Sequence, residues 1–260
     1  MKRKIAVFLT ALLAATSLVG CGSKVELTTR EVLEGMRDAM ADVTSVEAKM
    51  VLDIDMTVSA QGKDIPMNMD GEVDVAYLME SDGGFATSMS GYVEAKVMGE
   101  ETRQNMKSRS FTEDGKTITY TYDNMSSSWE SEYAESEENA DQFEVDVEEL
   151  LTFLTLKEEV KKYGGAECYV LTGKADPSVM GDLSGELLLV DSDGLEFKMS
   201  LYVNKDTFRP EGVTLEVPAT KQEEDGVVIK ISKMKMSIEI GKYDSLKDGD
   251  IENPYFEDYF

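Results

Sequence analysis

The residue with the clearest potential chemistry in this chain is Cys21. Its thiol lies at the end of Leu18-Val19-Gly20-Cys21, directly after a short apolar segment. Lys2, Arg3 and Lys4 give the chain a positive start, and the apolar run that follows, 5–15, is too short to span a bilayer. A positive start, a short apolar run and small residues before one fixed position are typical of a secretory signal. The sequence therefore predicts export from the cytoplasm.

Residues 18–21 resemble the lipobox of bacterial lipoproteins. That resemblance implies that residues 1–20 are a lipoprotein signal peptide and that the sulfur of Cys21 is lipidated. Cys21 would then be the first residue of the mature chain, and 21–28 would form a tether. We expect an extracytoplasmic protein that its lipid anchors to the outer face of the cell membrane. The alternative is an ordinary signal peptide with a chance cysteine.

Residues suited to catalysis or metal binding are scarce in this chain. The chain has no histidine, which removes the commonest general base and the commonest metal ligand. Cys168 lies in a strand-like run beside Glu167, which disfavours a thiolate, so we expect a small buried apolar residue. Asp191-Ser192-Asp193-Gly194 begins like a calcium loop but lacks its later acidic positions, and a hairpin turn is expected. We predict no enzyme, no cofactor and no metal site.

Acidic side chains dominate the charge of the chain. There are 52 aspartates and glutamates against 26 lysines and arginines, a formal net charge of −26. Nucleic acid is excluded as a partner because it requires cationic contacts to phosphates. One interpretation of this charge is that it keeps the protein soluble and holds it away from an anionic membrane surface. The alternative is that it attracts a cationic partner or cations. The segment 130–141 is expected to be a mobile acidic loop.

Hydrophobic periodicity predicts an α+β protein. Thr28 and Glu31 have the spacing of a capping box, which predicts a helix over 29–42. An apolar stripe predicts a second helix, which ends at Tyr163-Gly164-Gly165. Asp176-Pro177 predicts the start of a short third helix that runs to about Leu183. Alternation of apolar and polar residues predicts strands over 46–58, 65–79, 85–97, 102–112, 116–123, 166–174, 185–191, 195–204, 210–218 and 226–242.

These elements predict one curved antiparallel β-sheet, a half-barrel, with a few helices against its concave face. A phase slip in the last strand, near Ser232-Lys233, predicts a β-bulge. We expect a single domain over 29–243, an acidic and aromatic C-terminal tail over 244–260, and a monomer.

Methionine is the notable apolar residue, with 16 copies. Many fall on the apolar faces of predicted strands, and methionine is common at adaptable binding surfaces because it is flexible and polarizable. A cavity for acyl chains and a plain core are both compatible with this pattern. The residues expected to line such a cavity are Met50, Leu52, Ile54, Met56, Met67, Met69, Val73, Met89, Met234 and Met236.

Two hairpin signatures extend the likeness to a known family. Tyr120-Thr121-Tyr122-Asp123-Asn124 is followed by Trp129, and 201–210 reads Leu-Tyr-Val-Asn-Lys-Asp-Thr-Phe-Arg-Pro. With the lipobox, the first helix and the long first strand, they resemble the LolA/LppX-like superfamily of bacterial lipoproteins and carriers. The resemblance implies an open half-barrel closed by helices, with an apolar cavity that in some members takes lipid or lipidated cargo. No invariant functional residue comes with it.

The function expected from the sequence is therefore non-catalytic. We expect a lipid-anchored binding module with a methionine-rich cavity for a lipid or another amphipathic ligand. The alternative is a protein–protein interaction module of the cell envelope with a filled core. Both would act at the membrane to which Cys21 is anchored.

Overall fold

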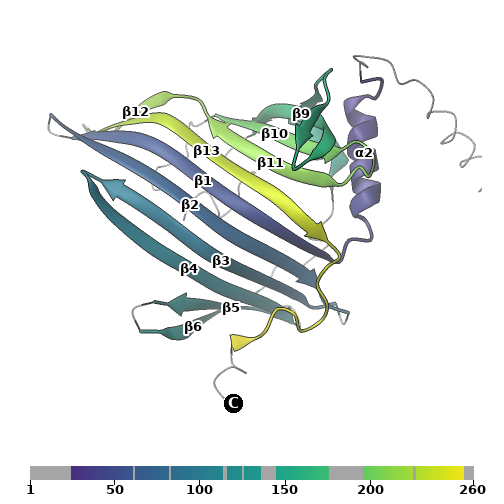
Figure 1. Cartoon of the computed structure of the whole chain (residues 1–260), viewed down its shortest axis with the longest axis horizontal. Coiled ribbons are helices and arrows are strands. Elements are labelled where there is room, and N and C mark those ends of the chain that lie inside the picture. Colours follow the sequence, from purple (N-terminus) through teal and green to yellow (C-terminus); the bar gives the residue numbers. More distant parts are fainter. Residues whose placement is uncertain are drawn as a thin grey trace, which may run out of the picture.

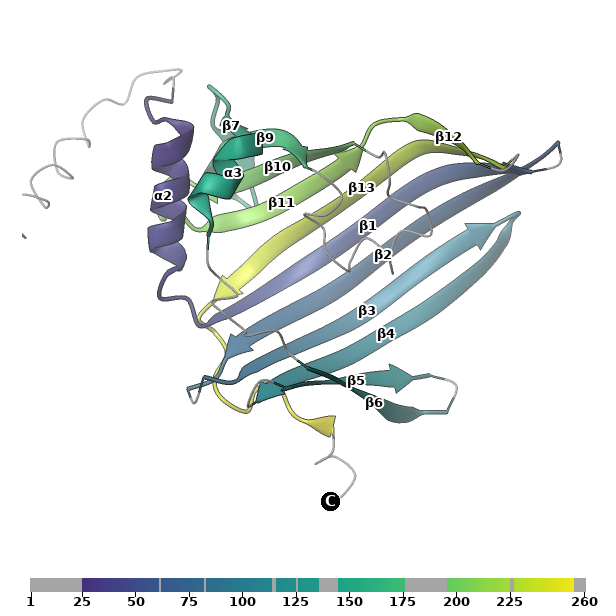
Figure 2. The same cartoon turned by 180° about the vertical axis from the view of Figure 1, so that it is seen from behind.

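The strands form one antiparallel sheet. The computed structural model describes residues 25–60, 62–81, 83–113, 116–124, 126–135, 145–175, 196–224 and 227–254. Their sheet has 13 strands in the order β6-β5-β4-β3-β2-β1-β13-β11-β10-β9-β7, with β12 beside β13 and β8 beside β9. Figures 1 and 2 show it from its two sides as an open sheet. The predicted α+β half-barrel is confirmed.

The bounds of the elements follow the predicted order. The helices are α2 (Thr29–Met40) and α3 (Val147–Phe153). The strands are β1 (Ser45–Ala60), β2 (Lys63–Met79), β3 (Phe85–Val97), β4 (Glu100–Glu113), β5 (Lys116–Asp123), β6 (Ser128–Glu135), β7 (Leu154–Leu156), β8 (Lys161–Tyr163), β9 (Ala166–Ala175), β10 (Phe197–Asn204), β11 (Pro210–Val217), β12 (Thr220–Glu224) and β13 (Val227–Tyr243).

The capping box predicted before the first helix is present. The Glu31 backbone N–H donates to the Thr28 hydroxyl at 3.2 Å, and the Thr28 backbone N–H donates to the Glu31 carboxylate at 2.7 Å. These bonds satisfy helix donors that would otherwise lack a partner, and they lower the pKa of Glu31. The predicted helix over 29–42 is confirmed as α2, which ends at Met40.

The centre of the sheet is β1, which pairs with β2 on one side and with β13 on the other. Asp55 is opposite Lys233 but Met56 is opposite Ile231, so Ser232 is the extra residue of a β-bulge. The bulge restores the alternation of apolar residues to one face after the phase slip. The predicted bulge near Ser232-Lys233 is confirmed.

The second predicted helix is present as α3, but its predicted extension to Tyr163 is wrong. The chain leaves the helical conformation after Phe153, and Leu154–Leu156 and Lys161–Tyr163 form β7 and β8 along β9. Gly173 makes this possible, since a Cβ there would lie 1.9 Å from the Phe153 carbonyl oxygen. A close backbone approach from a distant strand therefore overrides the helical stripe.

The prediction of an acidic loop over 130–141 is wrong for its first part. Ser128–Glu135 forms β6, in which Trp129 pairs with Tyr122 and Glu130 with Thr121 of β5. Cross-strand aromatic pairing stabilises the hairpin, while the side chains of Glu130 and Glu132 are exposed. Segment 136–144, the predicted helix over 176–183, the predicted strand over 185–191, the turn at Asp191 and Cys21 lie outside the described residues.

Candidate functional site: a methionine-rich sheet face

Apolar side chains of neighbouring strands meet on one face of the sheet. We call it the inner face and define it by Met50, Leu52 and Ile54 of β1. Leu52 is opposite Met236 of β13 and Gly71 of β2, and Met236 is opposite Leu215 of β11. Residues directly opposite each other lie within contact distance on one face, so the apolar rows become a continuous surface.

The structure brings all ten residues predicted to line the cavity into one cluster. We call it the methionine cluster. Its predicted members Met50, Leu52, Ile54, Met56, Met69, Val73, Met234 and Met236 are 1–7% exposed, while Met67 and Met89 are partly buried against them. Eight of the chain's methionines belong to or touch this cluster: Met50, Met56, Met67, Met69, Met89, Met199, Met234 and Met236. That they bind a ligand stays a prediction.

Four buried members of the methionine cluster were missed. They are Phe197, Leu215, Val217 and Ile231. The alternation that marks β10, β11 and β13 as strands was visible in the sequence. Which face these strands share with β1 depends on pairing between distant segments, for which the sequence carried no direct signal.

The two helices pack at one end of the same inner face. There a second cluster, which we call the helix-packed cluster, contains four residues of α2 and one of α3 together with residues of β1, β7, β9 and β10. Its buried members are Val32, Leu33, Met36, Met40, Val43, Val46, Val147, Leu154, Leu171, Leu201 and Val203. Figures 1 and 2 show α2 beside this end of the sheet, far from the β5–β6 hairpin.

Within the described part of the chain, the methionine cluster draws its buried members from strands alone, without a residue of α2 or α3. The two clusters are therefore built differently. One is a conventional helix-on-sheet core, and the other is a cluster of buried strand side chains to which neither described helix contributes.

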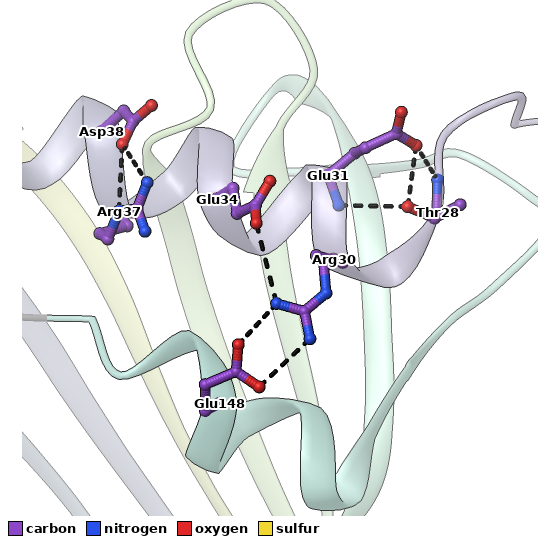
Figure 3. A network of polar contacts seen from close by, with 7 residues as sticks. All are labelled: Thr28, Arg30, Glu31, Glu34, Arg37, Asp38 and Glu148. Carbon is purple, nitrogen blue, oxygen red and sulfur yellow. Dashed lines mark hydrogen bonds and ion pairs between the residues drawn. The ribbon is translucent and has the colours of Figure 1, made fainter.

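Polar contacts fix the position of α3 against α2 (Figure 3). The Arg30 guanidinium donates to both carboxylate oxygens of Glu148, at 2.6 and 3.2 Å. This bidentate pair lowers the pKa of Glu148 and raises that of Arg30. The Leu156 backbone N–H also donates to the Thr29 hydroxyl at 3.0 Å. The contacts connect the start of α2 to both α3 and β7.

The predicted hairpin of 201–210 also holds α2 in place. The Asn204 side-chain oxygen accepts bonds from the backbone N–H groups of Asp206 and Thr207, at 2.9 and 3.1 Å. Phe208, at the end of this turn, lies against Gly35 of α2, where a Cβ would be 2.5 Å from its ring. The contact between this turn and α2 therefore requires a glycine at position 35 of the helix.

Cys168 has the structural role expected for it. Its side chain is 0% exposed, and burial raises the pKa of the thiol to about 11. We expect no reaction with a thiol reagent such as DTNB at pH 8 in the folded Cys21→Ser variant, in which Cys168 is the remaining cysteine. Unfolding in guanidinium should make it react at once. Rapid labelling of the folded protein would contradict the buried position.

A metal centre and a membrane-spanning helix are both absent from the described ranges. No three acidic, cysteine or histidine side chains there are arranged to hold a metal ion. No helix there has the length and apolar character needed to cross a bilayer.

Comparison with known proteins gives likenesses of fold. No protein-family model matches the chain, and no curated protein matches its sequence. Among solved structures, LprF from Mycobacterium bovis is similar at a TM-score of 0.47 and 12% identity, covering 90% of this chain and 99% of LprF. A chain of the Pseudomonas aeruginosa MucA/MucB complex is similar at a TM-score of 0.35 and 12% identity, covering 86% of this chain and 60% of that one.

Proposed function

We propose that the protein is a non-catalytic, lipid-anchored binding module that takes a lipid or another amphipathic ligand on its methionine cluster. The observation that carries the proposal is that the buried members of this apolar cluster come from strands and include no residue of the two described helices. Flexible thioether side chains can adapt to an acyl chain without a fixed shape. We place the module outside the cytoplasm, anchored through Cys21, with one domain over 29–243.

The chemistry of the face suits an apolar ligand. Met50, Met69 and Met236 come from three different strands, and their side chains are 5–7% exposed. The buried members of the methionine cluster are all apolar, so an acyl chain would leave no polar group of theirs unsatisfied. Ionic headgroups would remain outside this surface.

Native mass spectrometry tests the proposal. We expect protein purified gently from its own membrane to carry a non-covalent lipid that denaturation releases. Palmitate added to ligand-free protein should raise the melting temperature, because a ligand that binds only the folded state stabilises it. Protein without adduct, together with an unchanged melting temperature in palmitate, would contradict ligand binding. The envelope interaction module would then be the better interpretation.

A further inference from the structure

The outer face of β4, opposite the methionine cluster, carries a row of cations over aromatic rings. The Arg103 Cζ lies 3.7 Å from the centre of the Tyr92 ring. The Lys107 Nζ and the Arg109 Cζ lie 4.9 and 5.4 Å from the centre of the Trp129 ring. We call these five residues the cation–aromatic row. Its three cations share one strand face and extend over about 20 Å.

Two of these cations, Arg103 and Lys107, form no ion pair with a carboxylate among the described residues. Elsewhere on the outer face, lysines pair with carboxylates across strands: Lys49 with Glu72 at 2.5 Å and Lys235 with Glu216 at 3.5 Å. Among the described residues, no carboxylate lies within ion-pair distance of Arg103 or Lys107. In a chain of net charge −26, these exposed cations can still pair with a carboxylate that reaches them, and each such pair contributes only modestly.

The C-terminal segment crosses the outer face to this row. After β13 it passes the ends of β2, β3 and β4, as the yellow ribbon shows in Figure 1. Ile251 packs with Leu78 and Ala86, and Pro254 is buried. The Arg109 guanidinium donates to the Glu252 carbonyl oxygen at 2.6 Å. The chain that follows Pro254 therefore starts at one end of the cation–aromatic row.

We propose that residues 255–260, Tyr-Phe-Glu-Asp-Tyr-Phe, dock on the cation–aromatic row as a ligand built into the chain. Six extended residues span about 20 Å, the length of the row. Glu257 and Asp258 lie three and four residues after Pro254, within reach of Lys107 and Arg103 in an extended chain. The four aromatic residues of the tail can pack on Tyr92 and Trp129. Attachment to the chain raises the effective concentration, so weak contacts suffice.

Trp129 is the single tryptophan of the protein, so its fluorescence reports on the row. We expect removal of residues 255–260 to increase acrylamide quenching of its emission about twofold, because one face of the indole ring loses its cover. Glu257→Gln with Asp258→Asn should do the same without shortening the chain. About 1 M salt should weaken the docking in the full chain, since it screens exposed charges.

Charge variants and a peptide test the specificity of the docking. Arg103→Gln with Lys107→Gln should increase quenching, whereas Lys49→Gln with Lys235→Gln, the same charge change at paired outer-face lysines, should leave it unchanged. A synthetic Tyr-Phe-Glu-Asp-Tyr-Phe peptide should restore the low quenching of the truncated protein and leave the full chain unaffected. Unchanged quenching in both tail variants would overturn the proposal. Equal binding of the peptide to the truncated protein and to the full chain would also overturn the proposal. It would indicate that the cation–aromatic row is free in the full chain and can bind a separate acidic partner.

Discussion

Replacement of Cys21 by serine is expected to release the protein from membranes or to leave it unprocessed. Serine cannot form the thioether that the lipobox resemblance implies. Stable anchoring needs at least two acyl chains, because a single chain binds a membrane only marginally. Protein that is processed without this lipid should therefore move to the soluble fraction. Fractionation followed by intact-mass measurement gives both readouts: the position of the protein and the presence of residues 1–20.

Cys168→Ser is the matched control for this experiment. It removes the other cysteine of the chain, which lies buried in β9. This variant should keep both its processing and its membrane association, with at most some loss of stability. If the Cys21→Ser protein were processed and retained like the wild type, lipid anchoring through this residue would be wrong.

Leu33→Ala is expected to lower the free energy of unfolding by about 2–5 kcal/mol. The Leu33 side chain is 0% exposed, in the helix-packed cluster, where its removal leaves a cavity between α2 and the sheet. Leu171→Ala, on the strand side of the same cluster, should cost a similar amount. Urea unfolding of each variant measures these costs.

Met236→Ala gives the informative contrast. In a ligand-binding face, part of the contact surface of this methionine belongs to the ligand, so we expect a cost below about 2 kcal/mol in ligand-free protein. Palmitate should then stabilise the variant less than the wild type. Met50→Ala and Met69→Ala should behave alike. If all three variants lose about 2–5 kcal/mol of unfolding free energy and palmitate stabilises none of them, the methionine cluster is a filled core.

Much of the fold was predictable because the informative patterns are local. The capping residues Thr28 and Glu31 predicted the start of α2, and alternation of apolar and polar residues predicted β1, β2 and β13. The phase slip predicted the bulge at Ser232 from the sequence of one strand alone. The predicted ligand-lining residues fall in one cluster because alternation assigns every second residue to one face.

The errors have non-local causes. Leu150, Leu151 and Leu154 continue a helical stripe, but Leu154 pairs with Gly173 of β9, a contact that local periodicity cannot show. The hairpin signature correctly predicted Trp129 on the strand that returns beside Tyr122, but the acidic composition after Trp129 concealed how far β6 continues. The cation–aromatic row was also missed, since its members belong to three different strands.

The pairing of β1 with β13 also has a kinetic consequence. Val46 is opposite Tyr243, so the central pair of the sheet joins residues that lie far apart in the sequence. β1 to β6 can form as successive hairpins, but the other edge of β1 stays open until β13 is available. Contacts between such distant residues slow folding and leave an unpaired edge exposed to aggregation. The last long strand of the chain thus controls when the sheet becomes continuous.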